Sequence, residues 1–163
     1  FPHIISHRGN TEGRVEADEN HPALIQDLFA QGLSVEVDVW GRELKHKIEL
    51  YLGHDEPRWR IHEGFLSNIY DLPRKTAAGE NPRMLITGTS LPRIWIHCKN
   101  IEALRLVKEL DSAYGSYHYF VHDKDDYALT SRGYLWTCNP SFRTRRVPMA
   151  LMDANNEYVT NIT

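Results

Sequence analysis

Cysteine is scarce in this sequence, and long apolar runs are absent from it. Cys98 and Cys138 are the only two cysteines, and they supply neither a disulfide framework nor the spacing of a zinc site. Both lie in apolar runs, where a buried free thiol is the usual state, so we expect a reducing, cytoplasmic location. No apolar run approaches the ~18 residues that a membrane span needs, and we therefore expect no stable membrane insertion.

An excess of charge of either sign is also missing. The 163 residues include 19 lysines and arginines against 22 aspartates and glutamates, which gives a net charge of −3. This balance excludes a broad electrostatic attraction to nucleic acid, and we interpret Arg143, Arg145 and Arg146 as part of a solvent-exposed loop. The length and composition are those of an ordinary globular protein, so we expect a single domain over residues 1–163.

What the sequence does contain is an alternation of strand-like and helix-like segments. Helices are predicted to begin at Asn20, which would be the N-cap, near Glu63, and at Asn100. Strands are predicted over Ile4–Ser6, Ser34–Trp40, Ile48–Leu52, Met84–Thr87, Arg93–Cys98, Tyr117–Val121, Tyr134–Thr137 and Pro148–Met152. The alternation indicates an α/β fold with mostly parallel strands. Because a complete eight-fold barrel needs ~200–250 residues, we expect a small or incomplete barrel with reduced helices.

Two acidic residues on the second predicted strand stand out. Glu36 and Asp38 are two positions apart, so their side chains share one face, while Val35, Val37 and Val39 share the other. Carboxylates that face a core cost several kcal/mol each when they are unpaired. A divalent cation such as Mg²⁺, Ca²⁺ or Mn²⁺ would remove that cost, whereas a solvent-facing strand edge would never incur it. Both interpretations stay open at this point.

Basic and imidazole side chains also end the predicted strands. His97 and Lys99 share a face, where Lys99 needs an anion and His97 is a metal ligand, a hydrogen-bond partner or a core residue. His7 and His54 each end a strand, and two histidines across a phosphate can act as general base and general acid. Arg8 offers a planar fork of donors that matches phosphate oxygens.

Taken together, these motifs resemble the glycerophosphodiester phosphodiesterase family of the phospholipase-C-like phosphodiesterase superfamily, as a short divergent branch. The resemblance covers residues 4–55 closely and residues 93–100 in part. It is carried by the order and spacing of His7-Arg8-Gly9, Glu19-Asn20, Glu36-Val37-Asp38 and His54-Asp55. In this family the first motif follows the first strand, the second precedes the first helix and the third lies on the second strand.

The resemblance implies a TIM-type (β/α) barrel, a divalent metal cofactor and a set of site residues. His7 and His54 would be the acid/base pair, and Arg8, Lys99 and Glu19 would bind phosphate, with Glu19 also able to order its loop or contact the metal. The metal ligands would be Glu36, Asp38 and His97, where His97 replaces a glutamate of the family. Imidazole binds Mn²⁺ or Zn²⁺ well and Mg²⁺ less readily, but Mg²⁺ and Ca²⁺ are the first expectation. Asp126, Tyr127 and Trp136 would line the pocket.

The function expected from these residues is metal-dependent hydrolysis of a small-molecule phosphodiester of the glycerophosphodiester type. One alternative is a non-catalytic module that binds a phosphate ligand or a partner on a degraded barrel. A second alternative is a phospholipase D-like lipid phosphodiesterase, which would need an exposed apolar lip. Trp40, Trp59 and Phe65 could form that lip or could pack in the core. The sequence indicates no particular oligomeric state.

Overall fold

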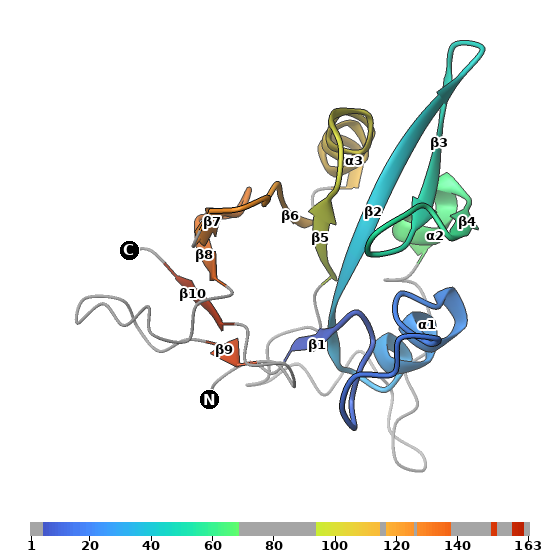
Figure 1. Cartoon of the computed structure of the whole chain (residues 1–163). Helices are drawn as coiled ribbons and strands as arrows, with labels where there is room; N and C mark the ends of the chain where they lie inside the picture. Colours follow the sequence, from blue (N-terminus) through green and yellow to red (C-terminus); the bar gives the residue numbers. More distant parts are fainter. Residues whose placement is uncertain are drawn as a thin grey trace.

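The computed structural model describes residues 5–68, 94–114, 117–125, 127–137, 151–152 and 158–161. These residues form a mixed α/β fold that is mostly sheet with few helices (Figure 1). The helices are α1 (Pro22–Ala30), α2 (Glu63–Asn68) and α3 (Ile101–Tyr114). The larger sheet contains β1 (Ile5–His7), β2 (Ser34–Leu44), β3 (Lys47–Leu52), β4 (Trp59–Ile61), β5 (Ile94–Cys98) and β6 (His118–Phe120). The smaller sheet contains β7 (Tyr127–Leu129), β8 (Tyr134–Thr137), β9 (Leu151–Met152) and β10 (Tyr158–Asn161).

Among the described strands, parallel pairing occurs only in the larger sheet. Strand β2 pairs in parallel with β1 and β5, and β5 pairs in parallel with β6. The β2–β3 and β3–β4 pairs and every pair of the smaller sheet are antiparallel, so the expectation of mostly parallel strands is wrong for the described residues. The cause is that β2 and β3 join through a tight turn, which allows only antiparallel pairing. The described strands form two sheets that do not close into a barrel (Figure 1).

The two faces of the larger sheet differ in what covers them. On one face, the valines of β2 pack with apolar residues of all three helices, and these residues form the main core. The opposite face carries a second cluster that includes Ile5, Trp95, Phe120 and Trp136, the last from the smaller sheet. Figure 1 shows β2 and β5 standing between α1 and α2 on one side and the smaller sheet on the other. The predicted alternation of apolar and polar faces along β2 is therefore confirmed.

The N-cap of the first helix lies one residue later than the predicted cap. His21 is the N-cap of α1, and its Nδ1 accepts a hydrogen bond from the Ala23 amide. Pro22 follows at the first helical position, where the missing N–H costs little. The prediction that Asn20 caps this helix is wrong, because Asn20 has a positive φ of 59° and its side chain bonds to β2 instead.

A close approach of α3 to β2 positions the end of β5. Asn100 Oδ1 accepts hydrogen bonds from the amides of Gly41 (2.9 Å) and Ala103 (3.0 Å), and Nδ2 donates to the Gly41 carbonyl (2.7 Å). A Cβ at position 41 would lie 2.4 Å from the Ala103 nitrogen, so only glycine fits there. Asn100 therefore caps α3, as predicted, and also fixes the helix to β2. The neighbouring Lys99 is held by its own amide, which donates to the Val39 carbonyl.

Several sequence predictions differ from the structure at the level of elements. Strands β4, β7 and β10 were not predicted, since they are short and lack a clear apolar alternation. The predicted strand at Met84–Thr87 lies outside the described residues, and so does Cys138. Cys98 is a buried free thiol, as predicted, and burial raises its pKa to about 12. None of the helices in the described ranges combines the length and the apolar character that a membrane span requires.

Candidate active site

A cavity of about 360 Å³ opens where the parallel strands end. Its walls include side chains from β1, β2, β5 and β8, together with the segments that follow β1, β3 and β5. The structure thereby brings together predicted site residues that lie far apart in the sequence, namely His7, Arg8, Glu36, His54, His97, Lys99 and Trp136. Carboxyl ends of neighbouring parallel strands meet at one edge of a sheet, which brings together the residues that end β1 and β5. The antiparallel hairpin of β2 and β3 returns His54 to the same place, and the smaller sheet contributes Trp136.

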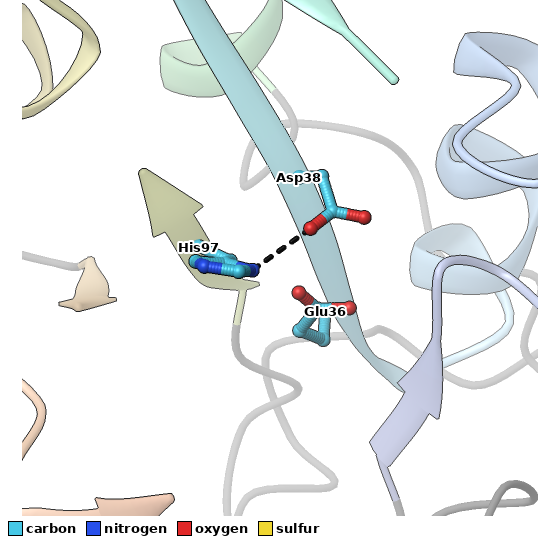
Figure 2. Close-up of side chains that lie close together, drawn as sticks. All are labelled: Glu36, Asp38 and His97. Carbon is cyan, nitrogen blue, oxygen red and sulfur yellow. Dashed lines mark hydrogen bonds and ion pairs between the residues drawn. The ribbon is translucent and has the colours of Figure 1, made fainter. Parts of the chain in front are cut away.

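Asp38 lies behind the cavity and is fully buried. Its Oδ1 is 2.8 Å from Nδ1 of His97 (Figure 2) and 3.7 Å from Nζ of Lys99. Its Oδ2 is 3.1 Å from Nε of Arg8. Burial alone would raise the pKa of Asp38, but the hydrogen bond with His97 and the positive charges of His97, Arg8 and Lys99 together lower it well below its usual range. Asp38 is therefore a carboxylate at any pH near neutrality.

Asn20 is a site residue that the sequence analysis did not identify. Its Nδ2 donates to Asp38 Oδ2 (3.0 Å), and its Oδ1 accepts from the Asp38 amide (2.9 Å). The amide side chain thus holds both the backbone and the carboxylate of Asp38. The available signal was the Glu19-Asn20 pair itself, but an asparagine before a helix is more simply explained as a cap.

Glu36 and His7 form a second buried pair at the cavity. Both side chains are almost fully buried, and His7 Nε2 lies 3.5 Å from Glu36 Oε2. The same Oε2 accepts a hydrogen bond from the Arg8 amide (3.3 Å). Burial and, to a smaller extent, the nearby Arg8 cation lower the pKa of His7 to about 3, although the Asp38 carboxylate opposes this shift. His7 is consequently a neutral imidazole at physiological pH.

His97 is held at both of its ring nitrogens. Nδ1 faces Asp38, and Nε2 lies 2.9 Å from the backbone carbonyl oxygen of His122. The ring also stacks on Phe120, with centroids 5.1 Å apart and planes 5° from parallel. Donor atoms of Glu36, Asp38 and His97 all lie within 4.8 Å of one another (Figure 2). Two buried carboxylates and an imidazole that converge in this way fit a divalent metal ion.

His54 differs from the other histidines because it lies on a loop and is 31% exposed at its side chain. Its Nδ1 lies 2.7 Å from Asp55 Oδ1. The loop is anchored by Gly53, whose carbonyl accepts a hydrogen bond from the Trp40 indole (2.7 Å). Gly53 has φ 153°, and a Cβ there would lie 2.0 Å from the Glu56 carbonyl oxygen, so this anchor requires glycine. Rigid attachment to β2 brings His54 to the cavity.

Glu19 does not line this cavity but an adjacent one that also includes His54, and its predicted contact with phosphate stays a prediction. Its buried Oε1 lies 3.5 Å from Nη1 of Arg8 and accepts hydrogen bonds from Arg14 Nε (3.0 Å) and Asn10 Nδ2 (3.4 Å). Glu19 therefore fixes the Arg8 guanidinium and orders the loop between β1 and α1, which agrees with the other role predicted for it.

The remaining predicted pocket residues have different outcomes. Trp136 is buried, lines the cavity and stacks on Phe120 at 4.8 Å. Tyr127 is 52% exposed on β7 and does not line the cavity, so its predicted place there is wrong. Asp126 lies outside the described residues.

Two further residues line the cavity without having been predicted to do so. His122 and Asp123 lie just after β6, separated from it by Val121, and line the cavity together with His97. The signal in the sequence was a His-Asp pair after a strand, which is the same pattern as His54-Asp55.

The apolar lip that a lipid-directed enzyme would need is not formed by the three residues considered for it. Trp59 and Phe65 pack against the main core. Trp40 is partly buried, and its indole is bonded to Gly53. These contacts remove the sequence-based reason for proposing a membrane-directed phospholipase.

Comparisons of this chain with protein-family models, with curated proteins and with solved structures found no match.

Proposed function

We propose that this protein hydrolyses a small-molecule phosphodiester of the glycerophosphodiester type by a two-histidine acid/base mechanism. The observation that carries the proposal is that His7 and His54 line one cavity together with Arg8 and Lys99. Two imidazoles beside two cations form a combination that can bind an anion and move protons on either side of it. The proposal includes the fold, in that the two sheets would be parts of an incomplete TIM-type barrel.

A divalent cation belongs to this proposal. Glu36, Asp38 and His97 would hold it, with Mg²⁺, Ca²⁺ and Mn²⁺ as the ions first expected for such ligands. When bound, the ion would supply positive charge for a phosphoryl oxygen and lower the pKa of a bound hydroxyl group. The fit rests on the donor set itself, because oxygens of two buried carboxylates and one imidazole nitrogen lie within 4.8 Å of one another.

The cationic side chains would orient the phosphate. Arg8 is held by Asp38 and Glu19, and Lys99 by Asp38, so both approach the cavity from fixed directions. Groups that are already oriented stabilise the charge that develops on phosphoryl oxygens without having to reorganise. We therefore expect substitution of Arg8 or Lys99 to weaken substrate binding and to lower the rate together.

The two histidines would have different roles. His7 is neutral, which is the form that accepts a proton, and a phosphodiester bound beside it would raise its proton affinity. His7 is therefore the general base for the attacking oxygen, from water or from a hydroxyl group of the substrate. His54 has its Nδ1 at Asp55, which leaves Nε2 to protonate the departing alcohol.

The test is hydrolysis of glycerophosphodiesters by the purified chain with Mg²⁺, Ca²⁺ or Mn²⁺. We expect His7→Ala and His54→Ala each to lower kcat by about 10²–10⁴-fold. His62→Gln is the matched control, since His62 is exposed and does not line the cavity, and it should leave turnover unchanged. Near-normal activity of both cavity variants, in proteins with unchanged circular dichroism, would contradict the proposal.

One observation favours a second candidate, a non-catalytic module that binds a phosphate ligand. Arg8 and Lys99 are both already engaged by Asp38, as in a preformed anion-binding site. Titration with glycerol 3-phosphate separates the two candidates. Binding that depends on Arg8, without turnover of any diester under any of the three metals, would favour the binding module.

A further inference from the structure

The identity of the proposed metal ion depends on which nitrogen of His97 is available to it. The His122 carbonyl oxygen, 2.9 Å from Nε2, can only accept a hydrogen bond, so Nε2 carries a hydrogen. Nδ1 faces the ionised carboxylate of Asp38, which can also only accept, so Nδ1 donates a hydrogen to Oδ1 (2.8 Å) that a bound metal ion would displace. With that hydrogen displaced, Nδ1 and the carboxylate of Asp38 would direct lone pairs at one position, which Glu36 also approaches (Figure 2).

The orientation of His97 is fixed independently of any ion. The ring stacks on Phe120, its partner across the β5–β6 ladder, and its side chain is only 12% exposed. A backbone carbonyl cannot rotate away as a side chain can, so the hydrogen bond from Nε2 keeps Nδ1 directed at Asp38. Such outer contacts fix which nitrogen a metal-binding histidine presents.

The charge around the three ligands is nearly balanced. Arg8 and Lys99 lie 3.1 Å and 3.7 Å from oxygens of Asp38, so two cations offset the two carboxylates of the ligand set. Mg²⁺ and Ca²⁺ bind mainly through electrostatic attraction to several oxygen ligands. At this site the attraction is weak, because Arg8 and Lys99 offset the charge of the two carboxylates. First-row transition ions gain more from a nitrogen ligand and depend less on net charge.

We infer that His97, bound through Nδ1, makes this centre selective for a transition ion such as Mn²⁺ or Zn²⁺ over Mg²⁺ and Ca²⁺. The inference rests on the proposed function, because it assigns the ion of that same site. It departs from the Mg²⁺ or Ca²⁺ that the ligand types alone suggest, and the departure comes from the position of a single imidazole.

The experiment is calorimetric titration of the full chain, stripped of metal and without substrate, with each of the four ions. We expect one site that binds Zn²⁺ and Mn²⁺ at least about 10-fold more tightly than Mg²⁺. Glu36→Gln should weaken this site, which separates it from adventitious binding elsewhere on the surface. Equal affinities for Zn²⁺, Mn²⁺ and Mg²⁺, or no binding of any ion, would overturn the inference.

Three variants of His97 test the nitrogen assignment. His97→Glu supplies a third carboxylate and should lower the ratio of Zn²⁺ to Mg²⁺ affinity at least about 10-fold. His97→Asn places its amide near the position of Nδ1 and should keep a site that prefers Mg²⁺. His97→Gln places its amide near the position of Nε2 and should bind every ion more weakly than the Asn variant. A reversed order of the Asn and Gln variants would overturn the assignment to Nδ1.

A spectroscopic measurement on the unaltered protein does not depend on the folding of any variant. Pulsed electron paramagnetic resonance of bound Mn²⁺ should show coupling to one imidazole nitrogen, and its absence would overturn the inference. Tight Zn²⁺ or Mn²⁺ binding without hydrolysis of any diester would contradict the proposed function alone. Hydrolysis that is supported best by Mg²⁺, with Mg²⁺ bound as tightly as Mn²⁺, would contradict the metal selectivity alone.

Discussion

On one face of β2, Val35, Val37 and Val39 pack beneath the helices; on the other, Glu36 and Asp38 face or adjoin the cavity. All five side chains are almost fully excluded from water. The valines gain free energy from burial, whereas the carboxylates lose hydration and must be compensated by His7, His97, Arg8 and Lys99. Equal burial therefore serves opposite purposes on the two faces, stability on one and charge placement on the other.

The largest effect on activity is expected from a substitution on the polar face of β2, which carries Glu36 and Asp38. Asp38→Asn keeps the shape of the side chain but removes the charge that holds His97, Arg8 and Lys99 in place. Loss of a contact that merely orients a metal ligand costs about 10–100-fold, so we expect the loss of a proposed ligand to lower kcat at least about 10²-fold. Breaking a buried pair should also lower the free energy of unfolding by about 3–5 kcal/mol.

Steady-state kinetics and urea unfolding of the Asp38 variant measure these two effects. Asp18→Asn in the exposed loop before α1 is the matched control and should change stability by less than about 0.5 kcal/mol. Activity of the Asp38 variant within threefold of the original would remove the polar face from the proposed chemistry.

A substitution on the apolar face of β2, which carries Val35, Val37 and Val39, should lower stability without changing activity. Val37→Ala removes two buried methyl groups from the main core and leaves a small cavity, so we expect the free energy of unfolding to fall by about 2–3 kcal/mol. Turnover per folded molecule should not change. Urea unfolding and active-site-normalised kinetics check this, and a loss of kcat comparable to that of the Asp38 variant would show that the two faces are not separable.

A pH dependence should distinguish the two faces further. The pKa of His7 falls to about 3 on folding from an ordinary value of 6.5, so the unfolded chain binds more protons between those values. Stability should therefore be complete above about pH 6.5 and decrease as the pH falls toward 3. Between pH 6.5 and 5 this contribution amounts to roughly 2 kcal/mol. Urea unfolding at several pH values should show a shallower slope for His7→Gln, and an unchanged slope would contradict the neutral buried imidazole.

The smallest effect on activity and stability is expected from a substitution that lies outside both faces of β2. Tyr127 is exposed on β7 and does not line the cavity. Tyr127→Ala should leave both kcat/KM and the unfolding midpoint nearly unchanged, with a change in stability below about 0.5 kcal/mol. A substantial rise in KM would place Tyr127 in contact with substrate and would extend the polar face onto the smaller sheet.

Sequence patterns predicted where the helices and strands lie better than they predicted which strands pair and in which direction. The helices α1 and α3 and the strands β2, β3 and β5 were located to within a few residues, because their apolar periodicity is strong. The short strands β4 and β7 were missed, since three residues carry little periodic signal. The mostly parallel sheet was a wrong prediction, because the smaller sheet is entirely antiparallel.

In the candidate site too, the sequence predicted the position of residues along a strand better than it predicted contacts between segments. The positions of Glu36, Asp38 and His97 on inward-facing strand positions followed from alternation. The placement of Glu19 beside Arg8, of Asn20 on Asp38 and of His122 at the cavity could not be predicted in this way. Each of these contacts joins segments that the sequence separates by a turn or by many residues, and a motif does not state which atoms will meet.

The amino-acid sequence by itself determined which faces of β2 and β5 are apolar, because side-chain alternation along a strand is a local property of the backbone. Only the tertiary structure decided that three cationic or imidazole side chains, those of Arg8, His97 and Lys99, surround Asp38, and that the His122 carbonyl selects the nitrogen that His97 presents. The physical reason is that electrostatic compensation depends on distances between segments, which are set when the sheet assembles.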